Sequence, residues 1–193
     1  MSTAAVTEVD ERAGLGQGAW SFYVVGQPGP QGSKSAKGIH GGRIIMTESS
    51  KKVAPWRQAV TAAAFGAGPC LDGPLVVGMV FSLRRPVSAR KSDIVPSRTP
   101  DLSKLARSTE DAITTAGLWA DDARVAAYCL LVKAYAGHQV PGLSDGISVP
   151  VTGAVVACAK LSPGAFDVVR DLLEQEILAM GQKSGRGPSA ANL

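Results

Sequence analysis

The chain has 193 residues, 45% of them hydrophobic, and carries a formal net charge of +4 from 20 basic and 16 acidic side chains. This length and apolar content suit one domain with a full core, and the mildly basic charge is compatible with a polyanionic partner. Three widely spaced cysteines, two isolated histidines and no apolar run near ~20 residues exclude a disulfide scaffold, a zinc site and a membrane span, so we expect a cytoplasmic protein.

The N-terminal part of the chain predicts two strands and one helix. Residues 1–18 are mostly small and charged, which predicts a flexible tail, and residues 20–25 form the first strand. The Gly- and Pro-rich residues 26–37 predict a loop. It is no phosphate-binding P-loop, because no glycine precedes Lys34, and we expect no nucleotide cofactor. Two elements follow: a return strand at residues 43–47 and a helix from near Pro55 to Gly66.

Basic side chains gather in the segments that precede and follow the next strand, residues 75–83, which is apolar enough to be central in a sheet. The loop at residues 84–98 is the most basic window of the chain and has only Asp93 against its cations. Such loops are either solvated or bind backbone phosphates. The loop at 26–37, the start of the first helix and the loop at 84–98 together contain nine candidate DNA-binding residues: Lys34, Lys37, Lys51, Lys52, Arg84, Arg85, Arg90, Lys91 and Arg98.

An amphipathic helix is predicted at residues 102–116. Thr99 is expected to cap it, Pro100 to take its first position, and Gly117 to end it in a left-handed conformation. The acidic pair Asp121 and Asp122 follows in a turn, and an apolar run at residues 125–132 predicts a largely buried strand.

The C-terminal part predicts one strand and one helix. Residues 137–150 form a loop, and a strand at 151–161 is expected to pair with its predecessor. Ser162 and Pro163 start a helix that Gly181 closes, before a flexible tail at 182–193. Its apolar stripe, expected to lie in the core or a dimer contact, is Phe166, Val169, Leu173, Ile177 and Met180. The order indicates one α+β domain at residues 19–181, a mixed or antiparallel sheet with helices packed on it.

The segment from Asp101 to Val125 carries a motif without a gap: Asp101, Leu102, Lys104, Leu105, Arg107, Asp111, Ala112, Gly117, Trp119, Asp121, Asp122 and Val125. This pattern resembles the core of the RusA-type Holliday junction resolvases, which are metal-dependent endonucleases of phages and bacteria. The resemblance covers about residues 20–160 and implies the family's fold and homodimeric state. One position departs from it, because Ser103 stands where the family has a second aspartate.

The resemblance implies roles for the motif residues. Asp101 and Asp122 would bind Mg²⁺, with Mn²⁺ as a substitute, because a hard cation prefers carboxylate oxygens. Asp121 is a further candidate ligand, and Arg107 stands where the family has a basic residue beside the phosphate. Ser103 would replace a carboxylate with a neutral hydroxyl, which lowers metal affinity. Lys104 adds a further DNA-binding candidate.

Geometry leaves the completion of this site open. Residues two apart point to opposite sides of a helix, so positions 101 and 103 converge only if Asp101 precedes regular helix. A helix over 102–116 is about 22 Å long, so Asp122 must return along the turn and strand or come from a second subunit. Taken singly, Asp101 reads as a helix cap, the Asp121–Asp122 pair as a solvated turn, and Arg107 as a surface residue.

The sequence therefore predicts a Mg²⁺-dependent endonuclease that resolves four-way DNA junctions by paired symmetric nicks, as a homodimer, in the host cytosol if a phage encodes it. Its partner would be branched DNA, with no membrane association. Two alternatives stay open. Ser103 allows a junction-binding protein with weak or lost cleavage, in which Glu110 or Asp121 could compensate. A nonspecific basic DNA-binding domain would give the acidic turn a structural role only.

Overall fold

The main sheet is mixed, which is one of the two forms expected for this α+β domain. A computed structural model describes residues 18–32, 34–40, 43–48 and 51–184. Four strands form its main sheet in the order β1-β6-β4-β5, with β6 antiparallel to both neighbours and β5 parallel to β4. Their bounds are β1 Ala19–Val25, β4 Leu75–Leu83, β5 Val125–Tyr135 and β6 Gly153–Lys160.

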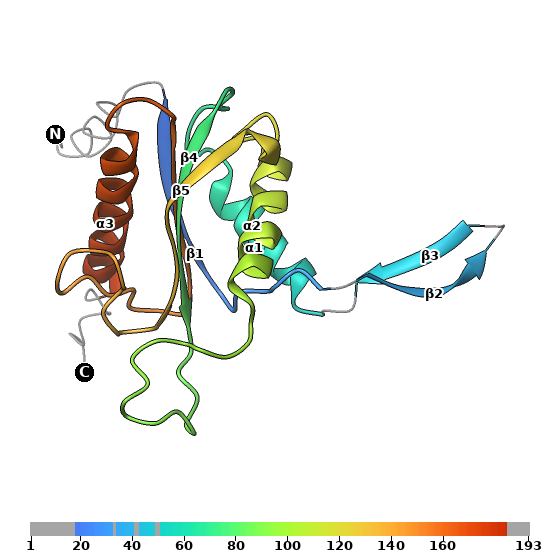
Figure 1. The fold of residues 1–193 in the computed structure, drawn as a ribbon, viewed down its shortest axis with the longest axis horizontal. Helices are drawn as coiled ribbons and strands as arrows, with labels where there is room; N and C mark the ends of the chain where they lie inside the picture. Colours follow the sequence, from blue (N-terminus) through green and yellow to red (C-terminus); the bar gives the residue numbers. More distant parts are fainter. Residues whose placement is uncertain (1–17, 33, 41–42, 49–50, 185–193) are drawn as a thin grey trace, which may run out of the picture.

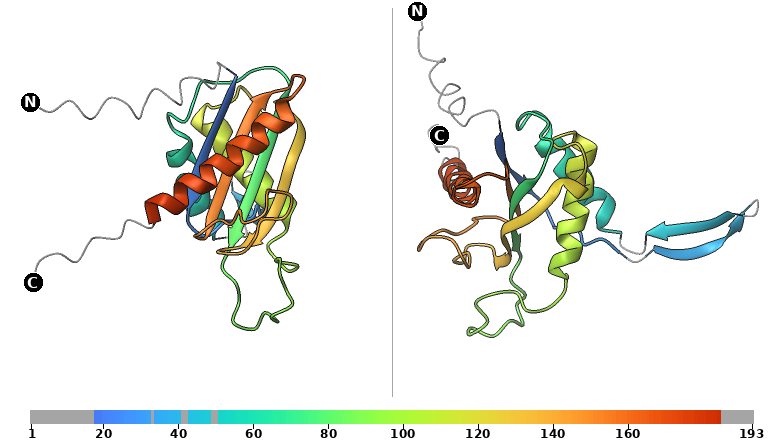
Figure 2. Two further views of the ribbon diagram at one scale, coloured as in Figure 1. Left: turned by 90° about the vertical axis from the view of Figure 1, so that its left-hand side faces the viewer. Right: turned by 45° about the horizontal axis from the view of Figure 1, so that its top comes forward.

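Helices cover both faces of this sheet (Figures 1 and 2). Helix α3, Ala165–Ser184, packs on one face, and helices α1, Val53–Ala64, and α2, Leu102–Ala116, pack on the other. All nine residues of β4 are buried, because the strand has a neighbour on each edge and a helical layer on each face. The central position expected for residues 75–83 is confirmed. None of the helices in the described part of the chain is long and apolar enough to cross a membrane.

A second, two-stranded sheet projects from this body as an arm (Figure 1). It consists of β2, Lys34–His40, and β3, Arg43–Glu48, paired antiparallel. The expected return strand at 43–47 is confirmed, but residues 34–37 are strand and not loop. The sequence did not predict β2, because a segment containing Gly38 has a weak intrinsic strand propensity. Its strand conformation depends on pairing with β3.

The strand order corrects two expectations. Strand β6 pairs with β1 and β4 and not with β5, its predecessor in the chain. The parallel unit β4-α2-β5 leaves the other edge of β4 free, and β6 fills that gap. Strand β5 is consequently an edge strand, and only its last two residues are buried. The apolar run at 125–132 is therefore only partly buried, where a largely buried strand was expected.

Helix ends differ from the sequence expectation in α2 and in α3. Asp101, with extended backbone, is the residue before α2, so neither Thr99 nor Pro100 caps or begins the helix. Gly117 does end α2 at a φ of 75°, a conformation that favours glycine, and its N–H donates to carbonyls of the last turn. Helix α3 begins at Ala165, whose N–H donates to the Ser162 carbonyl (3.0 Å), and continues past Gly181 to Ser184. Residues 1–17 and 185–193, which include most of both expected tails, lie outside the described residues.

Candidate active site

Asp101 lies on the surface at the beginning of α2, among basic groups. Its carboxylate is 3.1 Å from Lys104 Nζ, one turn further along the helix, and its side chain is 52% exposed. Lys133 reaches across from β5 and donates hydrogen bonds to the carbonyls of Arg98 (2.9 Å) and Pro100 (3.0 Å). Because Asp101 precedes regular helix, the condition for it and the exposed Ser103 to approach one ligand is met.

Asp121 and Asp122 lie beyond the other end of α2. Asp122 begins a 3₁₀ turn, Asp122–Arg124, and is exposed. Asp121 Oδ1 accepts a hydrogen bond from the Ala123 N–H (2.8 Å) and so caps that turn. Arg124 is held on Asp72, with 2.8 Å between Nε and Oδ1. Asp121 thus has a structural role, while Asp122 is the freer carboxylate of the two.

Glu110 and Tyr128 form a contact that connects α2 to β5 beside Asp122. The Tyr128 hydroxyl donates to Glu110 Oε1. Burial raises the pKa of Glu110, with smaller contributions from Asp122 and Asp111, while the Tyr128 hydrogen bond and Arg107 oppose this rise. Burial and then Glu110 raise the pKa of the Tyr128 hydroxyl, which stays protonated. Sequence reasoning weighed Glu110 only as a compensating ligand and missed Tyr128, because their contact depends on how β5 packs along α2.

The two candidate metal ligands lie at opposite ends of this arrangement. Strand β5 runs back along α2, since Tyr128 meets Glu110 just past the middle of the helix and Lys133 meets Pro100 before its start. From Asp101 to Glu110 alone the helix rises about 13 Å, whereas two oxygens on one Mg²⁺ lie within ~4.2 Å of each other. Among the residues that the structure describes, no three His, Cys, Asp or Glu side chains gather where they could hold a metal ion. A single chain therefore does not assemble a carboxylate site from Asp101 and Asp122.

Asp111, another motif residue, holds α1 against α2. Arg57 of α1 forms an ion pair with Asp111 and also donates to Gln31 Oε1 in the loop after β1. Next to it, Trp56 Nε1 donates to Thr109 Oγ1 of α2 (3.1 Å). Sequence reasoning missed this pairing, because a single arginine on a helix gives no signal of its partner.

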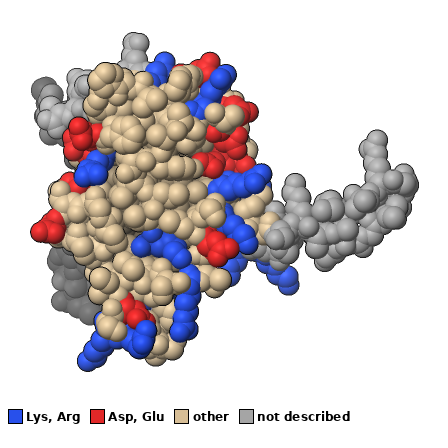
Figure 3. All heavy atoms as spheres, in the orientation of Figure 1, with Lys and Arg blue, Asp and Glu red and all other residues tan. Residues whose placement is uncertain are grey.

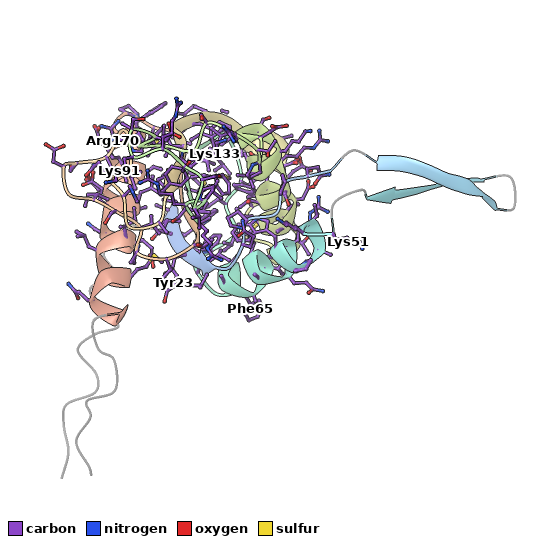
Figure 4. The ribbon with its side chains drawn as sticks, turned by 90° about the horizontal axis from the view of Figure 1, so that it is seen from below. Tyr23, Lys51, Phe65, Lys91, Lys133 and Arg170 are labelled. Carbon is purple, nitrogen blue, oxygen red and sulfur yellow. The ribbon has the colours of Figure 1, made fainter. Side chains whose placement is uncertain are left out.

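The two ends of α2 differ in charge (Figure 3). Glu110, Asp111, Asp121 and Asp122 lie in the half toward Gly117, and the expected cation Arg107 is exposed in the same region. Basic residues lie around the other end, toward the 84–98 loop. We define this basic surface as Lys52, Arg84, Arg85, Arg90, Arg98, Lys104 and Lys133. The expected DNA-binding residue Lys91 lies apart from it, on the α3 side of the loop (Figure 4).

Other candidate DNA-binding residues lie near the arm. Lys51 is exposed at the start of α1, close to where the arm leaves the body (Figure 4). Lys34 and Lys37 lie on β2, and their side chains are outside the described part of the structure. Arg107 and Lys104 are both exposed on α2, so the structure brings cations to the helix that follows Asp101.

The chain was compared with known protein families. A family model described as endodeoxyribonuclease RusA matches residues 25–144. The matched range contains the arm, the basic loop, α2, the acidic turn and β5, while β6 and α3 lie beyond it. None of the curated proteins matches this chain.

Proposed function

Because this chain belongs to the endodeoxyribonuclease RusA family and is therefore a hydrolase acting on DNA, we propose that it cuts four-way junctions with a divalent metal, as a homodimer. The observation that carries the proposal is the gap-free motif, which lies on one helix and the turn after it. This motif presents exposed carboxylates at both ends of α2, with cations between and beside them.

The donor set suits magnesium, although one chain does not bring it together. Asp101 and Asp122 offer exposed carboxylate oxygens, which Mg²⁺ prefers, and Ser103 offers a hydroxyl. A bound divalent cation supplies activation of water and neutralises charge on the scissile phosphate. We assign Asp101 of one copy and Asp122 of a second copy to the same site, because their separation within one chain prevents them from sharing an ion.

Strand β5 is suited to meet a second copy. It is one of the two edge strands of the main sheet, and its residues Cys129 to Val132 are only partly buried although all are apolar. A two-fold axis across β5 exchanges the two ends of α2. The acidic end of one copy, with Asp122, would then meet the basic end of the other, with Asp101.

Neighbouring cations have roles that need no metal. Arg107 is a planar bidentate donor that can hold a phosphate and stabilise its developing charge, although it cannot act as a general acid. Lys104 neutralises Asp101 in the free protein and is placed to contact the DNA backbone on binding. Binding by such cations releases counterions, so junction affinity should fall steeply as salt rises.

The test is cleavage of a labelled mobile four-way junction in Mg²⁺ or Mn²⁺. We expect the wild type to make paired symmetric nicks, and Asp122→Asn to cut at least ~100-fold more slowly while binding the junction as well or better. Removing a negative charge near phosphate explains the retained binding. Equal loss of binding and cleavage in Asp122→Asn would contradict the proposal, because it would indicate a structural role for this residue.

A second candidate function is a junction-binding protein with weak cleavage. Two observations favour it: Ser103 adds no charge, and the Lys104 ammonium competes with a metal for the Asp101 carboxylate. In that case the wild type binds junctions without cutting them, and Ser103→Asp restores cutting. A nonspecific DNA-binding domain is distinguished by competition, since linear duplex would then displace the junction equally well.

A further inference from the structure

A pocket of about 520 Å³ opens beside Asp101, at the basic end of α2. It lies between the end of β4, the 84–98 loop, the end of β5 and the segment that leads into α2. Lys52, Arg84, Arg90, Arg98, Pro100 and Tyr135 are among its lining residues. We name it the loop pocket. Its volume is in the range of pockets that enclose a small organic ligand.

The loop that forms this pocket is held in shape by Arg85. The Arg85 guanidinium lies 5.5 Å from the centre of the Tyr135 ring, and its nitrogens contact His138 Nε2 (2.9 Å) and the Arg90 carbonyl (2.6 Å). Arg85 is thus a positioning residue, although it was expected to bind DNA. The loop pocket is consequently shaped before any ligand arrives, which lowers the entropic cost of binding.

The other end of the loop is fixed to the sheet. Lys133 of β5 donates to the carbonyls of Arg98 and Pro100, so the wall of the pocket next to Asp101 is connected to β5. Asp93 accepts from the Arg90 N–H (3.1 Å) and lies 3.5 Å from its guanidinium. Lys133 therefore connects the loop to the sheet, and Asp93 connects two parts of the loop to each other.

The charge of the loop pocket favours an anion. Four cations, Lys52, Arg84, Arg90 and Arg98, line it against the one carboxylate of Asp93, which leaves three net positive charges. Since Asp93 already faces Arg90, the remaining cations have no acidic side chain within the pocket to pair with. Arginine matches the geometry of a phosphate by two parallel hydrogen bonds.

The remaining lining suits a flat heterocycle more than a second phosphate. Pro86, Pro96, Pro100 and Leu83 give apolar surface, and the Tyr135 ring adds an aromatic one. Hydroxyls and an amide stand among them, from Ser88, Ser97, Thr99 and Gln27, and can donate to or accept from the edge of a base. A phosphate, a flat apolar face and polar edges together describe a nucleotide.

We propose that the loop pocket receives one unpaired nucleotide of the DNA substrate, next to the phosphate that is cut. The inference rests on the proposed junction substrate, because bases at a point of strand exchange leave their stack at lower cost than bases within a duplex. The pocket wall ends at Pro100, and Asp101 is the next residue. A base held there would set the sequence at which the junction is cut.

The test places 2-aminopurine, whose fluorescence rises when it unstacks, at each position beside the crossover in turn. The full-length protein is added without divalent metal, so the strands stay intact. We expect a several-fold rise in fluorescence at one position with the wild type. Filling the pocket by Ser97→Trp should abolish the rise while junction binding is retained, and Ser88→Trp on another part of the wall should do the same.

A matched control comes from the same loop. Val87 is fully exposed and does not line the pocket, so Val87→Trp should keep the full fluorescence response. In Mg²⁺, the wild type and Val87→Trp should prefer the same base at the cleavage position. Ser97→Trp should cut junctions that differ at this base at more similar rates.

Two results would overturn the inference while the proposed function stands: no position responds although the junction is bound and cut, or Ser97→Trp keeps the response. Failure of the wild type to bind junctions at all would contradict the proposed function, and this inference with it.

Discussion

Glu110 is the residue at which the electrostatics of the acidic end can be measured. Its pKa is raised above the ordinary 4.5 mainly by burial, against the hydrogen bond from Tyr128. A carboxyl whose pKa is higher in the folded than in the unfolded state adds to the free energy of unfolding, and this contribution is complete at pH values below 4.5. That contribution is lost as pH rises through the folded-state pKa.

We therefore expect Glu110→Gln to gain stability over the wild type as pH rises. The variant keeps the shape and an oxygen that accepts from Tyr128 but cannot ionise, so its free energy of unfolding should lack this pH-dependent loss. The measurement is urea denaturation of both proteins at a series of pH values from 4 upward. A difference between the two that does not change with pH would show that burial does not destabilise the Glu110 carboxylate.

At this scale the sequence revealed the candidates but not their neighbours. The exposure of Asp101 and Asp122 agrees with their choice as candidates. The pairings of Asp101 with Lys104, Asp121 with Ala123, and Tyr128 with Glu110 could not be read in advance. The first two are local contacts two or three residues apart, and the motif does not show which local partner a carboxylate takes. The contact of Tyr128 with Glu110 depends on how β5 folds back along α2, and a linear motif holds no information on that.

At the scale of elements, α1 and α2 form one layer through side chains that cross between them. The Arg57 to Asp111 ion pair is about one-third exposed on each side, and the Trp56 indole donates to Thr109 within the buried interface. Because Arg57 also holds Gln31, this contact fixes the segment that leads into the arm. Asp111 thus has a structural explanation that requires no part in catalysis.

We expect Asp111→Ala to lower the free energy of unfolding by about 1 kcal/mol, since partial exposure weakens the pair but Arg57 loses its carboxylate. Urea denaturation measures this, with Asp145→Ala as the control, because Asp145 is exposed in the loop before β6. Junction cleavage should persist at temperatures well below unfolding. Unchanged stability together with abolished cleavage would instead place Asp111 in the active site.

Element positions followed closely from the sequence where local signals were strong. The strand at 75–83 has the bounds expected from apolar patterning, and α2 ends where Gly117 predicts. Local signals failed for β2, which its partner strand defines, and for the start of α2, where Thr99 and Pro100 suggested a beginning two residues too early. Those two outcomes depend on contacts beyond the segment itself.

At the scale of the whole molecule, the strand order decides what the site can be. Because β6 lies between β1 and β4, β5 is an edge strand. Strand β5 runs along α2, so the acidic end and the basic end of α2 both lie along the same edge of the sheet. The sequence left open whether one subunit completes the metal site. Separation of Asp101 and Asp122 along α2 is the physical reason to assign its completion to a second copy.

The most direct test of this shared site is to mix two inactive variants, Asp101→Asn and Asp122→Asn, and allow their subunits to exchange. A mixed dimer then has one site with both aspartates intact and one with neither. We expect each variant alone to bind the junction without cutting it, and the mixture to recover nicking of one strand but not paired nicks. If Ser103 leaves the wild type inactive, both variants are made in Ser103→Asp. A mixture as inactive as its two components, with subunit exchange demonstrated, would contradict a metal site built from two copies of this chain.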